Sequence, residues 1–213
     1  MTQDTDEKPK GWRGSRELWL DAAREAFIAS GIDAVKIQPL ASRLGLSRTS
    51  FYWFFDDREA LLQALLDDWD KINTRCLVQA TEAFAETITE AALSVIGIFL
   101  PGGGFEPRLD LAVRGWAHQS DTIAAKVNAT DDLRLSAIRR MFERFGFDPG
   151  EADVRARTMY LVQIGYISMQ VQEDVGLRLA RIPNYVKTFT GQAPDPRELA
   201  RFGAKHGDAD LAG

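Results

Sequence analysis

Apolar residues recur every three or four positions along most of the chain, which is the period of a helix with one buried face. In the first such segment, Leu20 and Phe27 fall on the same face. Ser15 is placed to cap the start of this helix, and Gly31 is placed to end it. We therefore predict a first helix over residues 15–30.

Two short helices follow in the pattern. The first carries Leu40 on its apolar face and ends at Gly45. Pro39 is tolerable there only within the first turn, where backbone N–H groups have no partner inside the helix. Ser47 can cap the second helix, which we expect to run through Phe54.

The remaining chain keeps the helical period. Asp56 opens a long helix, since carboxylates suit the positive end of the helix dipole, and its apolar stripe predicts continuation to about Ala83. We see no alternating strand pattern, internal repeat or low-complexity tract, so the predicted fold class is all-α. Further helices are predicted over residues 86–100, 108–118, 121–126, 129–145, 150–174, 177–190 and 196–206, the last with a capping box at its start.

Residues 40–55, "LASRLGLSRTSFYWFF", have the spacing of a helix-turn-helix. Ala41 is small enough for two helices to approach, Gly45 supplies the left-handed turn, and Leu46 and Phe51 fill the shared core. The opposite face of the second helix carries short polar groups and one arginine, which suit the base edges of a DNA major groove. The residues predicted on that face are Arg48, Thr49, Ser50 and Trp53.

The run "FIASGIDAVKIQPLASRLGLSRTSFYWFFDDREALL" resembles the N-terminal domain of the TetR family of bacterial transcriptional regulators. The resemblance covers roughly residues 16–66, and beyond residue 70 only the all-helical layout agrees. The matching positions are Phe27, Gly31, Ile37, Leu40, Ala41, Gly45, Leu46, Ser47, Tyr52, Phe54, Phe55, Arg58 and Leu61.

This resemblance implies a division of the chain into a head and a body. Residues 1–14 are polar, with Gly and Pro, and are expected to be a disordered tail. Residues 15–57 would be a helix-turn-helix DNA-binding domain with three helices. Residues 58–213 would be a helical domain that binds an effector and dimerises.

The resemblance also implies roles for single residues. Tyr52 matches the tyrosine whose hydroxyl binds a DNA phosphate. Arg58 stands where the family usually has a lysine that contacts a phosphate, and its planar fork could hold two phosphate oxygens. Thr49 stands where glycine is common. Lys36 stands where a Thr or Ser cap is common, which leaves that helix start without its usual cap and places a cation near the DNA backbone.

Each of these residues also has a simpler interpretation. Tyr52 could be a core aromatic with its hydroxyl at the surface, and Arg48 a solvated arginine. Trp53 could pack on the first helix instead of touching a DNA sugar or a thymine methyl group. Four basic residues near the N-terminus could form a minor-groove arm or stay solvated. They are Lys8, Lys10, Arg13 and Arg16.

The distribution of charge changes this picture more than its total does. The chain of 213 residues has a net charge of −5, which alone would argue against nucleic acid. Residues 8–55, however, carry eight basic and four acidic residues, whereas residues 56–213 carry eighteen basic and twenty-four acidic ones. A mildly basic head on an acidic body is expected if only the head meets phosphate.

Composition favours a globular protein of the cytoplasm. No window approaches the roughly 18 apolar residues of a membrane span, and the polar first residues lack the apolar core of a signal peptide. Cys76 is the single cysteine, which excludes an internal disulfide and fits a reducing compartment. The two histidines are far apart, and no cysteines or carboxylates have ligand spacing, so we expect no metal and no cofactor.

The body should hold an effector and a dimer interface. Several of its helical positions carry large apolar side chains, most of them aromatic with a polar tip. Such residues line small-molecule sites, but they also occur in protein cores and dimer interfaces. The stretch "MYLVQIGYISMQVQ" (159–172) is apolar on more than one face, and Gly165 would permit close helix approach, which favours a homodimer. The candidate effector-pocket residues are Trp69, Phe99, Trp116, His118, Tyr160, Gln163, Tyr166 and Met169.

We therefore expect a homodimeric repressor that a small-molecule effector releases from a palindromic double-stranded DNA operator. The resemblance implies that the effector would act through the fourth helix. Two other classes compete: a helix-turn-helix used for protein–protein contact, and a helical enzyme with an incidental head. No Ser/His/Asp or Cys/His set argues for catalysis, and the loop "PGGGFEPR" (101–108) lacks the lysine of a phosphate-binding loop. Asp131 and Asp132 are interpreted as a solvated helix face.

Overall fold

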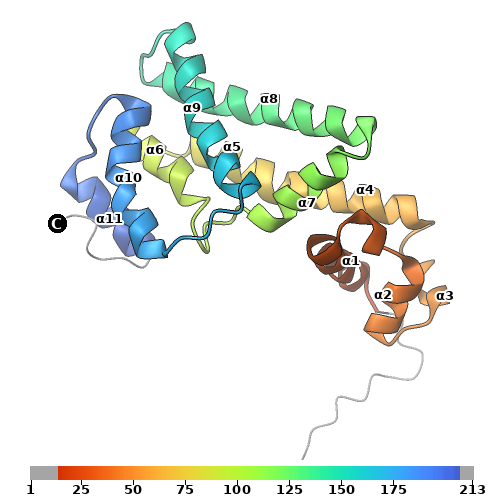
Figure 1. Ribbon diagram of the computed structural model, residues 1–213. Helices are drawn as coiled ribbons and strands as arrows, with labels where there is room; N and C mark the ends of the chain where they lie inside the picture. The colour runs from red at the N-terminus through yellow and green to blue at the C-terminus, as the bar shows by residue number, and fades with distance from the viewer. Residues whose placement is uncertain (1–13, 207–213) are drawn as a thin grey trace, which may run out of the picture. The chain divides into compact units, whose positions relative to one another are not determined.

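The computed structural model describes residues 14–206, which form helices and connecting turns without any strand (Figure 1). The expected all-α class is confirmed. The expected tail at residues 1–14 lies, apart from Gly14, outside the described residues. The α-helices are α1 (Arg16–Ser30), α2 (Ile37–Leu44), α3 (Arg48–Phe51), α4 (Arg58–Trp69), α5 (Arg75–Glu82), α6 (Ile88–Gly97), α7 (Pro107–Ala117), α8 (Asp121–Arg144), α9 (Pro149–Ser168), α10 (Val175–Thr190) and α11 (Pro196–His206), with a 3₁₀ turn at Ile32–Ala34 and a π-helical segment at Asp70–Thr74.

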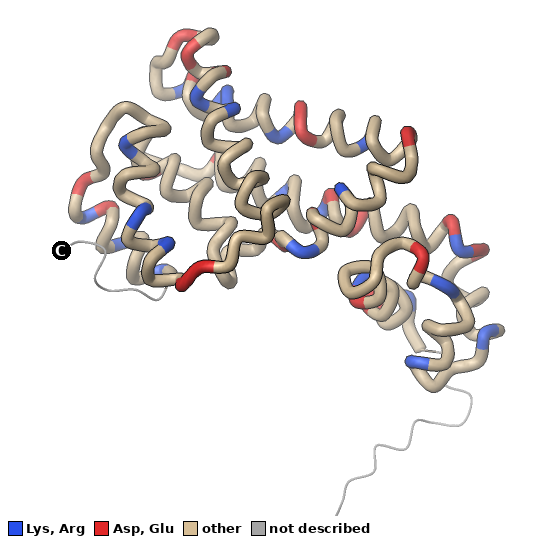
Figure 2. The backbone as a smooth tube through the Cα atoms, in the orientation of Figure 1, with Lys and Arg blue, Asp and Glu red and all other residues tan. Residues whose placement is uncertain are grey.

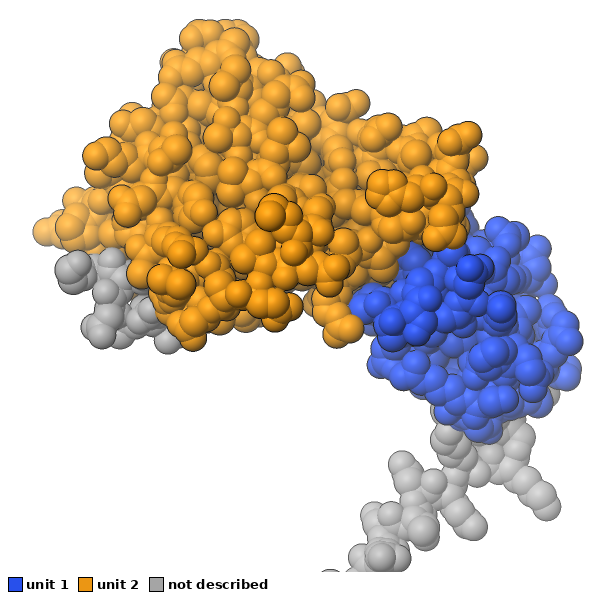
Figure 3. All heavy atoms as spheres, viewed as in Figure 1, with its two compact units in different colours: residues 1–67 blue, residues 68–213 orange. Residues whose placement is uncertain are grey.

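The chain divides into two compact units (Figure 3). The first ends at Asp67 and the second begins at Asp68. We refer to them as the head and the body. The functional division expected between residues 57 and 58 stays a prediction, because compactness reports packing and not function.

Local sequence signals explain the ends of the head helices. The Ser15 hydroxyl accepts a hydrogen bond from the Leu18 backbone N–H at 3.2 Å, as expected of a helix cap. Gly45 has a φ of 64° and a ψ of 34°, the left-handed conformation that glycine adopts without strain. The Ser47 hydroxyl caps α3 through the Ser50 backbone N–H at 3.2 Å. These three predicted signals are confirmed.

Helix α3 is shorter than predicted. It ends at Phe51, and the expected continuation to Phe54 is wrong. The chain instead tightens into turns, in which the Phe54 N–H donates to the Phe51 carbonyl oxygen at 3.0 Å and the Trp53 N–H donates to the Ser50 carbonyl oxygen at 3.4 Å.

The head core is aromatic. Trp19 from α1 meets Phe51 edge to face, with ring centroids 5.4 Å apart, and Phe51 stacks on Phe55 at the same separation. All three side chains are buried. Aromatic pairs of this geometry contribute beyond the area they bury, so this cluster fixes α3 against α1.

The predicted long helix from Asp56 to about Ala83 is interrupted by a change of helical type. The chain is α-helical over Arg58–Trp69, π-helical over Asp70–Thr74, and α-helical again over Arg75–Glu82. A π-helical turn holds an extra residue and is less favourable than an α-turn, so it persists where tertiary contacts stabilise it.

In the body, α8 is one helix where two were predicted. The expected break between residues 126 and 129 is wrong because the helix continues through Val127 and Asn128, and Val127 is buried in a stripe that runs along the whole helix. Helix α9 ends at Ser168 and not at Asp174, since Gln170 adopts a positive φ of 49° that stops the helix.

The capping box of α11 is confirmed. The Arg197 N–H donates to the Asp195 side chain at 2.7 Å, and the Asp195 N–H donates to the Glu198 side chain at 2.9 Å. The remaining predicted helices are present, with ends shifted by a few residues. The core of the body is built mainly by α5, α6, α8, α9, α10 and α11, and α8 and α9 run side by side (Figure 1).

Candidate nucleic-acid interface and effector site

The face of α3 and its following turn is exposed, while the opposite face is buried. Arg48 and Thr49 are exposed, and so are Tyr52 and Trp53, with 47% and 62% of their surfaces accessible. Phe51, between them, is fully buried. The caps and the aromatic core thus present two polar and two aromatic side chains at the surface of the head.

The exposed face lies in a stretch of chain without acidic residues. Between residues 34 and 55 the only charged side chains are Lys36, Arg43 and Arg48, all basic. Figure 2 shows this part of the head in tan and blue, with red only beyond its ends. Such a surface attracts a polyanion.

Arg48 and Tyr52 lie one helical turn apart and contact each other. Arg48 Nη2 donates a hydrogen bond to the Tyr52 hydroxyl at 3.3 Å. The predicted base-reading residue and the predicted phosphate-binding residue therefore share one face. Their contacts with DNA stay predictions.

Ser50 does not lie on this face, and its predicted place there is wrong. Its side chain is buried, and its hydroxyl lies 2.9 Å from the hydroxyl of Ser47. Because α3 is a single turn, the third residue after the cap points back toward that cap. Ser50 thus belongs to the start of the helix and not to the exposed surface.

Arg58 holds the turn that precedes α2. Its Nε donates to the Val35 carbonyl oxygen at 2.7 Å, and its Nη2 donates to the Ile32 carbonyl oxygen at 3.0 Å. The guanidinium that was expected to hold two phosphate oxygens therefore holds two backbone carbonyl oxygens. These carbonyls have few other hydrogen-bond partners because the chain forms only one 3₁₀ turn there. Lys36 is exposed and starts α2 without a side-chain cap, as its sequence predicts.

Replacing Arg58 by lysine is expected to destabilise the head by about 1–2 kcal/mol, because one ammonium group cannot replace two guanidinium contacts with separate carbonyls. Urea unfolding of the full chain would measure the change. The matched control is Arg43→Lys on the exposed surface of α2, which should change stability by less than about 0.5 kcal/mol. If Arg58→Lys is as stable as the wild-type protein, the hydrogen bonds of Arg58 do not stabilise the head, and phosphate binding is the better explanation for a cation at this position.

Three of the four basic residues proposed for a minor-groove arm, Lys8, Lys10 and Arg13, lie outside the described residues. The fourth, Arg16, is the first residue of α1, and its guanidinium lies 5.0 Å from the centre of the Phe55 ring. It thus packs on the head core in this structure.

The eight predicted effector-pocket residues do not gather at one place. His118 is exposed and Met169 is 78% exposed, so neither lines an enclosed site. Phe99 is buried against Phe105, with ring centroids 4.6 Å apart. Trp116 is half-buried. A helical period identifies the face that repeats, but it does not show which face a neighbouring helix covers.

Two more predicted residues belong to the packing between α9 and α10. Gln163 is buried and accepts a hydrogen bond from Arg178 at 3.2 Å. The hydroxyl groups of Tyr166 and Tyr185 lie 3.0 Å apart. These contacts join the two helices, and none of them leaves an open space that we can assign to a ligand.

The last two predicted residues, Trp69 and Tyr160, meet in a buried ionic cluster. At its centre Asp110 is fully buried and accepts from Trp69 Nε1 at 2.8 Å and from Arg134 Nη1 at 2.9 Å. Arg114 Nε donates to the other Asp110 oxygen at 2.7 Å. The Tyr160 hydroxyl lies 3.2 Å from Arg134 Nη1.

Asp131 completes the cluster at its partly exposed edge. It accepts from both terminal nitrogens of Arg114, at 2.9 and 2.7 Å, and from the Tyr160 hydroxyl at 2.6 Å. Its predicted place on a solvated face is therefore wrong, although Asp132 beside it is exposed. We call Trp69, Asp110, Arg114, Asp131, Arg134 and Tyr160 the ionic cluster.

Charge within the cluster keeps its groups in fixed protonation states. Burial alone would raise the pKa of Asp110, but Arg134 and Arg114 outweigh it and hold that pKa below its ordinary value. Burial raises the pKa of Tyr160, and Asp131 adds to this, while Arg134 opposes it. Asp110 is thus a carboxylate and Tyr160 a neutral phenol near pH 7.

The π-helical segment contacts this cluster directly. The Thr74 hydroxyl accepts from Arg134 Nε at 3.1 Å, and Asn73 Nδ2 lies 3.5 Å from an Asp110 oxygen. Asn73 also bonds both ways with the backbone of Glu106, at 2.8 and 3.2 Å. These contacts aim two consecutive polar side chains inward and explain why the wide turn persists.

The sequence reasoning did not select Asp110, Arg114 or Arg134. Two signals could have found them. Asp110 and Arg114 are spaced by four residues on one helix, which is the spacing of an ion pair. Arg134 is the charged residue in the stripe of α8 that runs from Val127 to Ile138, and a charge in a buried stripe has to be paired.

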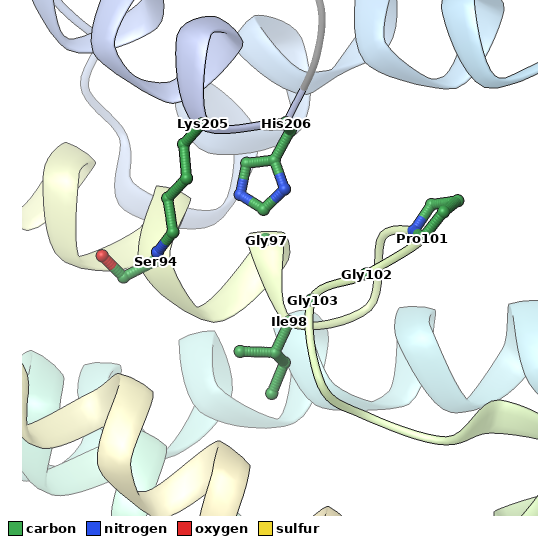
Figure 4. A pocket seen from close by; sticks show the side chains of 8 residues that line it. All are labelled: Ser94, Gly97, Ile98, Pro101, Gly102, Gly103, Lys205 and His206. Atoms are coloured by element: carbon green, nitrogen blue, oxygen red, sulfur yellow. The ribbon is translucent and has the colours of Figure 1, made fainter.

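A small pocket of about 230 Å³ opens elsewhere in the body, between α6 and α11 (Figure 4). No predicted effector residue lines it. Burial lowers the pKa of His206, and Lys205 beside it acts in the same direction, so the imidazole is neutral near pH 7. The lining residues are Ser94, Gly97, Ile98, Pro101, Gly102, Gly103, Lys205 and His206.

Cys76 contacts Gly103, one of the residues that line this pocket. Its sulfur is 3.6 Å from the Gly103 carbonyl oxygen, and burial raises the pKa of the thiol. A protonated, partly buried thiol is a packing group and not a nucleophile.

Residues 14–206 contain no group of three or more His, Cys, Asp or Glu side chains that could hold a metal ion. None of the helices described in this range combines the length and the apolar character that crossing a membrane requires.

Known proteins resemble the chain in two ways. Over 52–53 residues of the head, it is 35% identical to the HTH-type transcriptional regulator SrpR of Pseudomonas putida and 40% identical to the class D tetracycline repressor protein of Escherichia coli. These alignments cover 24% and 25% of this chain and 24% of each relative, so the chain matches about a quarter of their length.

Solved structures match the chain over most of its length. The AmtR structure from Mycobacterium smegmatis aligns with a TM-score of 0.60 and 20% identity, covering 95% of this chain and 98% of that one. A putative TetR-family transcriptional regulator from Mesorhizobium loti aligns with a TM-score of 0.56 and 14% identity, covering 89% and 95%. At these identities the likeness concerns the fold.

The family model described as "Bacterial regulatory proteins, tetR family" matches residues 20–65, which contain the Ser47 cap, the left-handed Gly45 and the exposed face of α3. Taken with the regulators that share this segment, the match identifies the head. Within residues 20–65, the head carries the helix-turn-helix domain of the TetR family of bacterial regulatory proteins.

Proposed function

We propose that the chain is a homodimeric transcriptional repressor that binds a palindromic DNA operator through α3 and leaves it when a small molecule binds the body. The observation that carries this proposal is the exposed face of α3. Arg48, Thr49, Tyr52 and Trp53 stand at the surface on a one-turn helix whose other side is locked into an aromatic core. A DNA-bound regulator acts where the chromosome is, in the cytoplasm.

We expect this surface to make two kinds of contact with DNA, one with phosphates and one with base edges. Tyr52 and Lys36 would bind phosphates, which fixes the position of the head on the duplex without reading sequence. Arg48 would read base edges in the major groove, with Thr49 and Trp53 beside it. The rival use of this helix-turn-helix, protein–protein contact, would not need a run of residues, 34–55, whose charged side chains are all basic.

A homodimer would bring two such surfaces to one operator. Along α9, Val154, Leu161 and Gly165 follow one another at helical spacing, with Val154 and Leu161 63% and 56% exposed. A side chain at Gly165 would meet nothing within 4 Å, so that side of the helix is open to a partner. Leu133 of α8 is 48% exposed as well. We propose that this apolar face pairs with its copy. Binding to successive major grooves would then require the two α3 helices of the dimer to stand about 34 Å apart on the operator.

Effector response would pass through the π-helical segment. Asn73 and Thr74 contact the ionic cluster, and the same stretch of chain continues N-terminally into α4. A ligand that changed the cluster would change the contacts that hold this segment. Such linkage commonly amounts to about 1–3 kcal/mol, and it acts equally on effector and operator binding.

The test is binding of the full chain to fragments of its own genome over a series of salt concentrations. The logarithm of operator affinity should fall linearly with the logarithm of salt concentration, so that affinity drops roughly a thousandfold or more between about 50 and 200 mM as phosphate contacts release counterions. Binding that is absent, or that does not change with salt, would favour a protein partner over DNA.

In the same experiment, Arg48→Ala should relax the preference at one base position per half-site, at a cost of about 1–3 kcal/mol for the best base. The salt slope should hardly change. The matched control is Arg197→Ala at an exposed position in the first turn of α11, outside the proposed DNA-binding and dimer surfaces, which should leave both affinity and preference unchanged. A uniform loss over all sequences would show that Arg48 binds phosphate and does not read bases.

A further inference from the structure

The pocket between α6 and α11 combines three polar side chains with bare backbone (Figure 4). Lys205 and His206 line it from α11, Ser94 lines it from α6, and a loop at residues 101–104 supplies another wall; we call this loop the glycine loop. None of the eight lining residues is acidic. At about 230 Å³ the pocket is smaller than the roughly 300–1,000 Å³ of sites for drug-sized ligands, so it suits a small molecule.

Two glycines set the shape of the pocket. A Cβ atom at Gly97 would lie 2.7 Å from His206 Nε2, so the absence of a side chain lets the imidazole approach α6 closely. A Cβ atom at Gly103 would lie 2.1 Å from the Gly97 carbonyl oxygen, so the glycine loop can fold against the end of α6 only without a side chain there. The walls are therefore backbone and the flat imidazole ring, which match a flat molecule.

The charge of the pocket comes from one residue. The ammonium group of Lys205 takes part in none of the hydrogen bonds and ion pairs found within residues 14–206. His206 is neutral near pH 7, and the Ser94 hydroxyl donates its proton to the Glu90 carbonyl oxygen at 3.2 Å. An anion in the pocket would therefore meet one opposite charge and no like charge among the lining residues, whereas a cation would be repelled by Lys205.

The glycine loop also connects the pocket to the π-helical segment. The Cys76 sulfur, at the start of α5, lies 3.6 Å from the Gly103 carbonyl oxygen. Just beyond the loop, the Glu106 N–H donates to Asn73 Oδ1 at 2.8 Å, and Asn73 Nδ2 donates to the Glu106 carbonyl oxygen at 3.2 Å. Asn73 belongs to the π-helical segment, so a ligand that displaced the loop would strain the contacts that hold this segment.

We propose that this pocket binds the effector, that the effector is a small, flat organic carboxylate, and that Lys205 selects it by pairing with its carboxylate group. This inference rests on the proposed function, in which a small molecule binds the body and releases the operator. It adds the place where that molecule binds, its chemical class and the residue that selects it. The glycine loop and Asn73 would pass the effect of binding to the π-helical segment.

The experiment compares three flat probes of nearly equal shape by NMR titration of the full-length protein at constant ionic strength. Benzoate is an anion, benzamide is neutral and benzamidine is a cation. The imidazole signals of His206 report on the pocket, and those of His118, the only other histidine and an exposed one, serve as the internal control. We expect benzoate to shift the His206 signals saturably and to bind roughly two- to fivefold more tightly than benzamide, the range for one ion pair with an exposed side chain. Benzamidine should bind most weakly.

Lys205→Gln removes the charge from the pocket, so it should abolish the preference for benzoate over benzamide. The matched control, Arg197→Gln, removes the same charge from an exposed position in the first turn of the same helix and should retain the preference. In operator binding, benzoate should weaken the affinity of the wild-type protein more than an equal concentration of benzamide does. This difference should disappear in Lys205→Gln.

Equal affinity for the three probes, tighter binding of benzamidine, or His206 signals that no probe shifts would each overturn the pocket as a carboxylate site. Binding of benzoate without any effect on operator affinity would overturn its role as the effector site. These outcomes leave DNA binding itself untouched, which the salt series measures separately. Conversely, a protein that fails to bind DNA but prefers benzoate through Lys205 would refute the proposed function and retain the carboxylate site.

Discussion

Replacing Asp110 by asparagine is expected to lower the free energy of unfolding of the body by about 3–5 kcal/mol, the usual cost of removing one partner from a buried ion pair. Asp110 contacts both arginines of the ionic cluster and Trp69 at the same time. Without its charge, Arg134 would remain fully buried with no counter-ion in contact. Asparagine preserves the volume of the side chain, so the effect reports charge and not a cavity.

Thermal unfolding of the full chain would measure this effect. For a domain of this size, such a loss corresponds to a fall in midpoint temperature of roughly 6–20 °C. The matched control is Asp153→Asn, which breaks the pair between Asp153 and Arg157 on the exposed surface of α9 and should cost less than about 1 kcal/mol. Similar midpoints for the two variants would mean that the cluster contributes little to stability.

The same residue predicts a dependence on pH. The pKa of Asp110 in the folded body lies below its ordinary value of 3.8, so the unfolded chain binds a proton more readily than the folded one. The stabilisation is therefore complete above about pH 5 and is lost as the pH falls toward and through the folded pKa. Asp110→Asn should flatten this acid limb of the stability curve relative to the wild-type protein.

The head could be predicted from sequence because its structure depends on local signals. Ser15, Ser47 and Gly45 act on backbone groups within a few residues of themselves, and each does so as its type predicts. The same locality explains the error at Ser50. A periodic face was assumed to continue, but α3 has only one turn, so the residue that closes its cap cannot also face outward.

Arg58 shows where residue type alone is insufficient. An arginine at a position associated with phosphate binding keeps the required charge, but its fork is satisfied by the carbonyls of Ile32 and Val35, more than twenty residues earlier in the chain. The choice between these partners depends on how the turn folds against α4. No spacing rule within either segment contains that information.

The ionic cluster is even harder to predict from sequence than the contacts of Arg58. Trp69 and Tyr160 were predicted to line an effector pocket, which stays a prediction, and the structure places both in the ionic cluster with Asp110 and Arg134 from two other helices. His118 and Met169 were predicted for the same pocket and are exposed. The difference arises from which helix faces pack together, which is a property of the assembled body. The π-helical segment likewise exists because of those contacts, not because of its own sequence.

Replacing Leu161 by glutamate is expected to convert the proposed homodimer to monomers. Leu161 lies at the centre of the exposed apolar stripe of α9, between Val154 and Gly165. A two-fold interface repeats every substitution, so two carboxylates would be brought together across the axis and lose their water. With at least about 3 kcal/mol lost per dimer, the dimer dissociation constant should rise a hundredfold or more.

Analytical ultracentrifugation over a range of protein concentrations would measure the dissociation constant, and operator binding would measure its consequence. The matched control is Leu177→Glu, because Leu177 is 49% exposed in the first turn of α10, similar to the 56% of Leu161, but lies outside the stripe. If the monomers still bind single half-sites with wild-type salt dependence, the two roles are separate. Helix α3 would then supply the contact with DNA, and the dimer would supply the spacing that combines two weak contacts into one specific site. An unchanged dimer in Leu161→Glu, or equal dissociation of both variants, would place the interface elsewhere on the body.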